Sequence, residues 1–122
     1  MNGIRHAARS IVVRRADNLL AVTFEDGRSF ELPAELLRVE SPSAEVQGHG
    51  PSEKRLVAGR SRVGIIAVEP VGTYAVRIGF DDLHDTGIYT WDYLYWLGEN
   101  RDAVWTAYVE ALGAAGLSRD PG

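Results

Sequence analysis

The clearest structural signal in the chain is the run Leu19-Leu20-Ala21-Val22-Thr23-Phe24-Glu25-Asp26-Gly27-Arg28-Ser29-Phe30-Glu31-Leu32. Large apolar side chains alternate with small or polar ones along its first half, which is the period-two pattern of a half-buried strand. Asp26-Gly27 predicts a tight turn, because glycine accepts the positive φ that such a turn requires. Arg28–Leu32 then returns as the second strand, so the run predicts an antiparallel hairpin.

The sequence on either side predicts one more strand, a second hairpin and short helices. The expected strands are 11–15, 63–69 and 74–80, and the expected helices are 34–38, 91–97 and 101–112. Thr90 and Asn100 suit the caps of the last two helices, and Gly98 suits the end of the first of these. This order predicts an α+β fold, in which small antiparallel β-hairpins or a sheet pack with short helices and a C-terminal helix.

The length predicts one domain. With 122 residues the chain can bury one core. We expect a flexible N-terminal arm over residues 1–10, a single domain over 11–116 and a flexible tail over 117–122. Residues 39–60 form a long connection, of the kind that is usually functional or mobile.

The composition of the chain argues against several classes of function. Seventeen acidic and 13 basic side chains give a net charge of −4, which argues against general nucleic-acid binding. The chain has no cysteine, which excludes disulfides and thiolate metal sites and fits a reducing compartment. No apolar run approaches the length of a membrane span, and the N-terminus does not read as a signal peptide. We therefore expect a cytoplasmic protein without membrane association.

The two side chains best suited to catalysis or metal binding, His49 and His84, lie in two polar loops. One interpretation is a metal site that combines both histidines with Asp82 and Asp85, since imidazole with carboxylate suits iron(II), manganese or zinc. The spacing matches no established metal motif. The other interpretation is that the aspartates bond their own backbone in a turn.

The same region offers candidates for binding a protein partner. Helical spacing places Trp96 away from the face of its helix that should pack on the sheet, and tryptophan is a favoured interface anchor. The expected partner-binding residues are Ser43, Glu45, Gln47, His49, Trp91 and Trp96. Neither Ser41 nor Ser43 lies in a Gly-x-Ser-x-Gly elbow, so an acyl-transfer enzyme is not expected.

Long ungapped motifs identify a family. They are Leu32-Pro-Ala-Glu-Leu-Leu-Arg-Val39, Ser41-Pro-Ser-Ala-Glu-Val-Gln-Gly-His-Gly50, Val68-Glu-Pro-Val-Gly-Thr-Tyr-Ala-Val76 and the segment 81–97. With these motifs the chain resembles the gamma-butyrobetaine hydroxylase-like N-terminal domain, and looks like its free-standing bacterial versions of unknown function. The resemblance implies a module that elsewhere precedes an iron- and 2-oxoglutarate-dependent catalytic domain, or is appended to P-loop ATPases that scaffold iron–sulfur clusters.

In the hydroxylases such a domain holds zinc through three cysteines and one histidine. His84 falls at the position of that histidine, but the cysteine-bearing stretch here offers Ser41, Ser43 and Val46. We therefore do not expect the tetrahedral zinc site. The resemblance implies a non-enzymatic accessory or interaction module with a protein partner, linked by analogy to iron or iron–sulfur cluster metabolism. The alternative is a small metal-binding protein that holds a divalent metal such as iron or zinc through His84 and His49.

Overall fold

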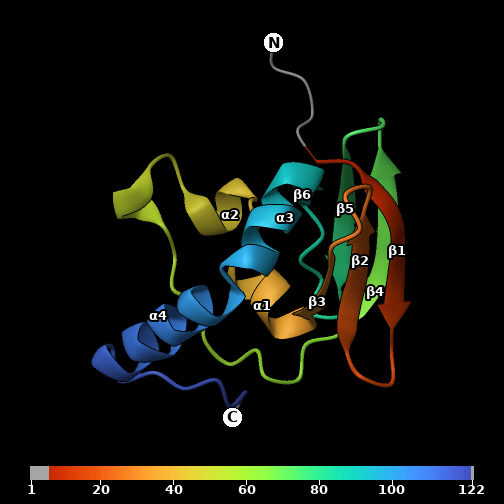
Figure 1. Ribbon diagram of the computed structural model, residues 1–122. Coiled ribbons are helices and arrows are strands. Elements are labelled where there is room, and N and C mark those ends of the chain that lie inside the picture. Colours follow the sequence, from red (N-terminus) through yellow and green to blue (C-terminus); the bar gives the residue numbers. More distant parts are fainter. Residues whose placement is uncertain (1–5, 122) are drawn as a thin grey trace.

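The computed structural model describes residues 6–121, which form two three-stranded antiparallel sheets and four α-helices (Figure 1). The first sheet has the order β1-β2-β3, with β1 (Ala8–Arg14), β2 (Leu19–Phe24) and β3 (Ser29–Pro33). The second has the order β4-β5-β6, with β4 (Ile65–Val71), β5 (Ala75–Phe80) and β6 (Gly87–Thr90). The helices are α1 (Ala34–Val39), α2 (Ala44–Gln47), α3 (Trp91–Glu99) and α4 (Arg101–Ala114), and η1 (Pro51–Glu53) is a single 3₁₀ turn. The predicted α+β class is confirmed.

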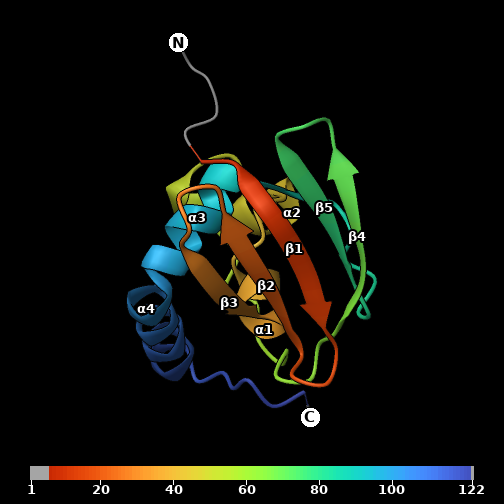
Figure 2. The same ribbon diagram turned by 45° about the vertical axis from the view of Figure 1, so that its right-hand side comes forward.

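The predicted hairpin forms β2 and β3 of the first sheet, with β2 as the central strand (Figure 2). Leu20 pairs with Leu32, and Val22 pairs with Phe30. Gly27 has a φ of 90°, the left-handed conformation expected at this turn. The alternating apolar side chains of β2 are all buried, so the period-two pattern marks the face that packs into the core.

The second sheet contains one strand that the sequence analysis did not predict. β6 pairs with β5 along four positions, from Ala75↔Thr90 to Ile78↔Gly87. The ladder between β4 and β5 shifts between Ile65 and Ala67, which places a bulge beside Gly79. This agrees with the unusual position of a glycine in the strand.

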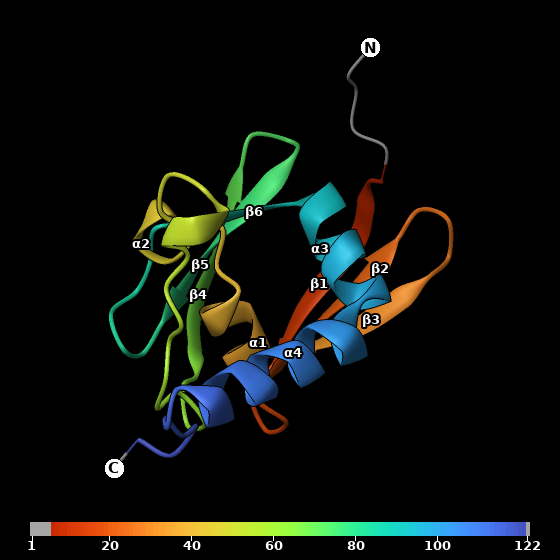
Figure 3. The same cartoon turned by 90° about the vertical axis from the view of Figure 1, so that its left-hand side faces the viewer.

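Helix α1 lies between the two sheets, with α4 crossing over it (Figure 3). All six of its residues are buried, including the charged Glu35 and Arg38. The core around it draws large apolar side chains from both sheets and from α3. The chain leaves this helix at the buried residues Glu40 and Ser41, and Ser41 belongs to the candidate site.

Both ends of the described chain are attached to the body of the domain. Residues 8–10, expected in the arm, belong to β1, and His6 stacks on Tyr95 with ring centres 3.6 Å apart. In the expected tail, the backbone of Ser118 and that of Arg119 accept hydrogen bonds from residues 59 and 61. Arg119 also makes two hydrogen bonds to Glu35. Residues 1–5 of the expected arm and Gly122 of the expected tail lie outside the described residues. No helix within residues 6–121 is long and apolar enough to cross a membrane.

Gly98 does not end α3, as the sequence analysis expected, but lies inside the helix, which continues to Glu99. The reason is packing. A Cβ built on Gly98 would lie 2.3 Å from Cγ of Phe30, so the glycine allows α3 to approach β3 closely. Thr90 does cap the helix, because its hydroxyl accepts the backbone N–H of Tyr93.

We expect Gly98→Ala to lower the free energy of unfolding by about 1–3 kcal/mol, the usual cost of overpacking, which outweighs the roughly 1 kcal/mol helix preference of alanine. Cγ is the root of the phenyl ring, so Phe30 cannot move away without repacking. Urea unfolding measures the effect. Gly113→Ala in α4 is the matched control, since an added Cβ meets nothing within 4 Å there, and it should stabilise the protein. A Gly98→Ala protein as stable as the parent would contradict this packing argument.

Candidate functional site

A buried chain of hydrogen bonds joins the start of the long connection to the turn before β6. His84 Nε2 lies 2.9 Å from Ser41 Oγ, and His84 Nδ1 lies 2.9 Å from Oε1 of Glu45. Ser41 has no exposed surface and His84 is buried, whereas the Glu45 side chain is 63% exposed. The chain therefore runs from the interior to the surface.

Neighbouring residues fix this arrangement. Ser43 caps α2 by accepting the backbone N–H of Glu45, and its hydroxyl lies 2.7 Å from that of Thr86. Thr86 in turn donates to Glu45 at 3.1 Å. Gly87 makes the crossing possible, because a Cβ there would lie 2.4 Å from Ser41 Oγ. Two loops distant in sequence are thus joined side chain to side chain.

Two arginines meet at Asp82 beside this chain. Nε of Arg38 and Nε of Arg60 each donate to Oδ2 of Asp82 at 2.7 Å, and Oδ1 accepts the backbone N–H of His84. Burial opposes ionisation of Asp82, but the hydrogen bonds from Arg38, His84 and Arg60 outweigh it and lower the pKa of the carboxyl. Asp82 therefore acts as a fixed negative charge that orients both guanidinium groups.

Glu45 determines the tautomer of His84. An ionised carboxylate only accepts, so the proton lies on Nδ1 and Nε2 accepts the Ser41 hydroxyl. Burial and the nearby charge of Arg38 lower the pKa of His84, and Glu45 and Asp82 offset this only in part. At neutral pH the imidazole is therefore uncharged.

The order of groups in Ser41–His84–Glu45 is that of a serine nucleophile with its base and orienting acid. A nucleophile must reach its substrate, however, and Ser41 has no exposed surface. Its hydroxyl also accepts the backbone N–H of Ser43 at 3.2 Å. The geometry therefore favours a structural role, in which the three side chains fasten the loops together.

The residues expected to bind a metal are not arranged as one site. His49 and His84 line the same cleft, but both ring nitrogens of His84 are already engaged. Asp82 is held by two arginines, and Asp85 is exposed and lies near the charge of Arg77. Among the described residues, no group of three or more His, Asp or Glu side chains is placed to hold a metal ion. Asp82 instead follows the turn interpretation, since it bonds the backbone two residues ahead.

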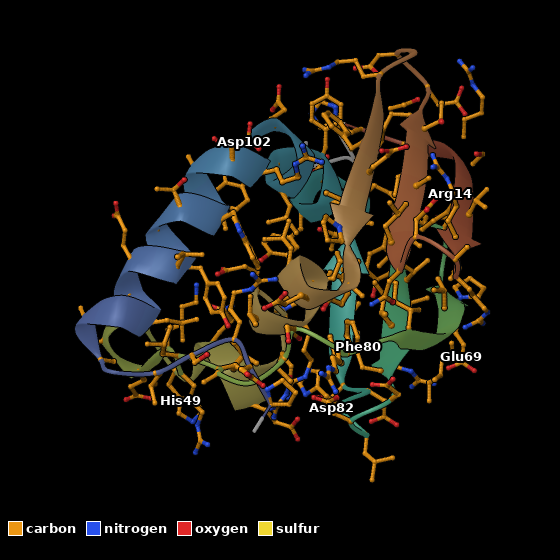
Figure 4. All side chains as sticks on the ribbon, turned by 90° about the horizontal axis from the view of Figure 1, so that it is seen from below. Arg14, His49, Glu69, Phe80, Asp82 and Asp102 are labelled. Atoms are coloured by element: carbon orange, nitrogen blue, oxygen red, sulfur yellow. The ribbon has the colours of Figure 1, made fainter. Side chains whose placement is uncertain are left out.

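Two hollows lie on either side of the segment Arg55–Val57, which lines both. The polar cleft has a volume of about 770 Å³, and its charged lining includes Arg38, Arg55 and Arg60. The apolar groove has a volume of about 400 Å³ and lies between this segment, α4 and Trp96. His49 and Asp82 both lie along the lower edge of the view in Figure 4.

The residues expected to bind a partner divide between the interior and the surface. Ser43 is buried against Thr86, and Gln47 donates to the carbonyl of Ser41. Trp91 is half-buried and donates to the carbonyl of Thr73. His49 and Trp96 are exposed, and the Trp96 indole stacks on the ring of Tyr93.

The structure adds functional candidates that sequence reasoning missed. Arg38, Arg55 and Arg60 line the polar cleft, and Leu56 lines both hollows. Arg55 and Arg60 lie outside the family motifs, and Arg38 lies inside one that indicates the family but no binding role for this side chain. The glycines on either side of His49, Gly48 and Gly50, were open to two interpretations, a flexible loop or a close approach of the backbone to a partner or ligand. A Cβ on Gly48 would lie 2.6 Å from that of Glu53, so this glycine allows a close approach within the chain itself, and a Cβ on Gly50 would meet nothing within 4 Å.

Comparison with known proteins confirms the resemblance. The model of the family described as gamma-butyrobetaine hydroxylase-like, N-terminal, matches residues 11–95. Two NMR solution structures of proteins share 46% and 43% identity with this chain, each with a TM-score of 0.83; they cover 98% and 99% of this chain and 94% and 92% of their own chains. A crystal structure of a protein of unknown function from Acidithiobacillus ferrooxidans, described as belonging to the DUF971 family, shares 35% identity with a TM-score of 0.66, over 80% of this chain and 98% of that one. No curated protein gives a significant match.

The lowered pKa of His84 predicts a pH dependence of stability. A group whose pKa is lower in the folded state favours folding above its ordinary pKa of 6.5, and this contribution is lost as pH falls through 6.5 towards the folded pKa. We expect the free energy of unfolding to decrease in this window and His84→Gln to remove that part of the decrease. Urea unfolding between pH 7.5 and 5 measures both. His49→Gln, at an exposed histidine, is the control and should keep the parent's profile. Equal slopes in the parent and His84→Gln would show that His84 is not the group responsible.

Proposed function

This chain belongs to the gamma-butyrobetaine hydroxylase-like N-terminal family, and on that premise we propose that it is a non-enzymatic accessory module that binds a partner protein. The observation that carries the proposal is the apolar groove beside Trp96. The indole is 48% exposed, although the neighbouring Tyr95 and Leu97 of the same helix are buried in the core. A large aromatic side chain at the rim of a hollow is the usual anchor of an interface.

The groove has the features of a docking site. Its floor is formed by side chains of α4 and the end of α1, and its apolar lining is Val39, Leu56, Val57, Trp96, Val104, Ala107, Tyr108 and Ala111. Tyr108 donates to the carbonyl of Val57 at 2.6 Å, which fixes the outer wall against α4. The groove is therefore preformed, so a partner need not order it on binding.

The groove also indicates the chemistry of its occupant. A hollow of about 400 Å³ accommodates one or two large apolar side chains rather than a whole helix face. Its charged rim has two basic residues, Lys54 and Arg55, and one acidic residue, Glu40, which pairs with Lys54. We propose a segment of a partner protein in which a large apolar residue is followed or preceded by a carboxylate.

A narrower proposal concerns the identity of the partner. By family analogy alone, we propose that the partner belongs to iron or iron–sulfur cluster metabolism. The buried Ser41 supports the non-enzymatic part of the proposal, because the nearest arrangement to a catalytic one has no access to substrate.

We expect Trp96→Ala to weaken partner binding by about 2 kcal/mol or more, roughly thirtyfold in Kd, as for other aromatic anchors. Binding partners are captured from cells with the parent, Trp96→Ala and Ile88→Ala proteins. A protein retained by the parent and lost with Trp96→Ala is purified and titrated by calorimetry.

Ile88→Ala is the matched control, because Ile88 is a similarly exposed apolar residue on β6 that does not line the groove. Circular dichroism confirms that both variants are folded. A purified partner that binds the parent and Trp96→Ala with equal affinity would rule out the groove as its site.

A further inference from the structure

We propose that the polar cleft binds an oxyanion, namely the phosphate or carboxylate group of a small ligand. The cleft has a volume of about 770 Å³, within the range of small-molecule sites. Three arginines and two histidines line it. The argument rests on which of these groups already have partners.

The hydrogen-bond donors of the cleft are only partly used. The side chain of Arg55 makes no hydrogen bond or ion pair with any described residue, and neither does the ring of His49. Nη1 of Arg38 is buried without a hydrogen-bond partner. Among the described residues it is the only buried side-chain nitrogen or oxygen that lacks one. Unused donors in a cleft are complementary to a ligand that supplies acceptors.

Each carboxylate of the cleft already has one oxygen engaged. Glu45 accepts from His84 and Thr86, and Glu53 accepts the backbone N–H of His49. Asp82, which holds the arginines from behind, accepts from both of them. The side chains of Arg55 and His49, in contrast, have no partner in the described part of the chain, and an oxyanion adds acceptors where these donors are free.

Arg38 is the donor of the cleft whose position is fixed by the fold. Its side chain is only 10% exposed, yet it lines the cleft, and Nη1 of its guanidinium group has no hydrogen-bond partner. Asp82 holds the guanidinium from its Nε side, so its orientation is set before any ligand arrives. A planar guanidinium oriented in this way matches the geometry of carboxylate and phosphate groups.

Arg55 lines both hollows, so the residue that separates the two proposals is Trp96. Trp96 lines the groove but not the cleft, so Trp96→Ala should bind the anion as the parent does. Failure of partner docking and failure of anion binding are therefore separate outcomes.

The test is titration of the ¹⁵N-labelled protein with inorganic phosphate and, separately, with succinate, at constant ionic strength maintained with sodium chloride. We expect saturable shifts of backbone amides in residues 44–60. Arg55→Gln should weaken the affinity roughly tenfold, the size expected for one charge-assisted hydrogen bond. Arg62→Gln is the matched control, because it removes an equal charge from an exposed arginine outside the cleft.

Saturable binding that Arg55→Gln weakens and Arg62→Gln leaves unchanged supports the proposal, and the tighter of the two probes tells a phosphate ligand from a carboxylate one. Equal loss in both variants would mean that the probe responds to net charge, and would overturn it. So would the absence of any shift beyond that caused by chloride. The side chain of Arg55 makes no hydrogen bond or ion pair with a described residue, and the substitution leaves the backbone bond from Arg55 to Val46 in place, so we expect the variant to fold and the result to be interpretable.

Discussion

Helix α1 is buried along its whole length, and this constraint organises the structure. The carbonyl groups in the last turn of a helix have no partners within it, and burial removes water as a substitute. Tyr89 donates to the carbonyl of Leu37 and Tyr93 donates to that of Glu40, each at 2.5 Å. Burial raises the pKa of both tyrosines, so they remain protonated donors. Strand β6 and helix α3 are thereby held against the end of α1.

The buried charged residues of α1 also need partners, and these partners lie far away in the sequence. Glu35 is paired with Arg119, which lies 84 positions away, and Arg38 with Asp82, which lies 44 positions away. Breaking an enclosed pair such as Arg38–Asp82 costs roughly 3–5 kcal/mol, because it leaves an uncompensated charge. The residues that orient the candidate cleft are therefore also residues on which the fold depends, and the site cannot vary without affecting stability.

Local signals allowed much of the fold to be predicted from the sequence. The first sheet was predictable because its alternation of apolar and polar residues and its Asp26-Gly27 turn lie within one short run of sequence. β6 was not, since four residues that begin with glycine become a strand only by pairing with β5. At the site, His84 and Glu45 could be selected by residue type. The pairing of Arg38 and Arg60 on Asp82 could not, because the arginines lie 44 and 22 positions from the aspartate and no local pattern links them.

The polar groups of this site fall into two kinds, those enclosed in the fold and those that a ligand can reach. Ser41, His84 and Glu45 are connected in the order of a catalytic chain, yet the serine is enclosed and each of its bonds serves to fasten a loop. Arg55 and His49 have no such connections, but they face a cleft that a ligand can enter. A buried network that satisfies its own members has little to offer a ligand. The groups that remain free at the surface are therefore the ones from which binding should be argued.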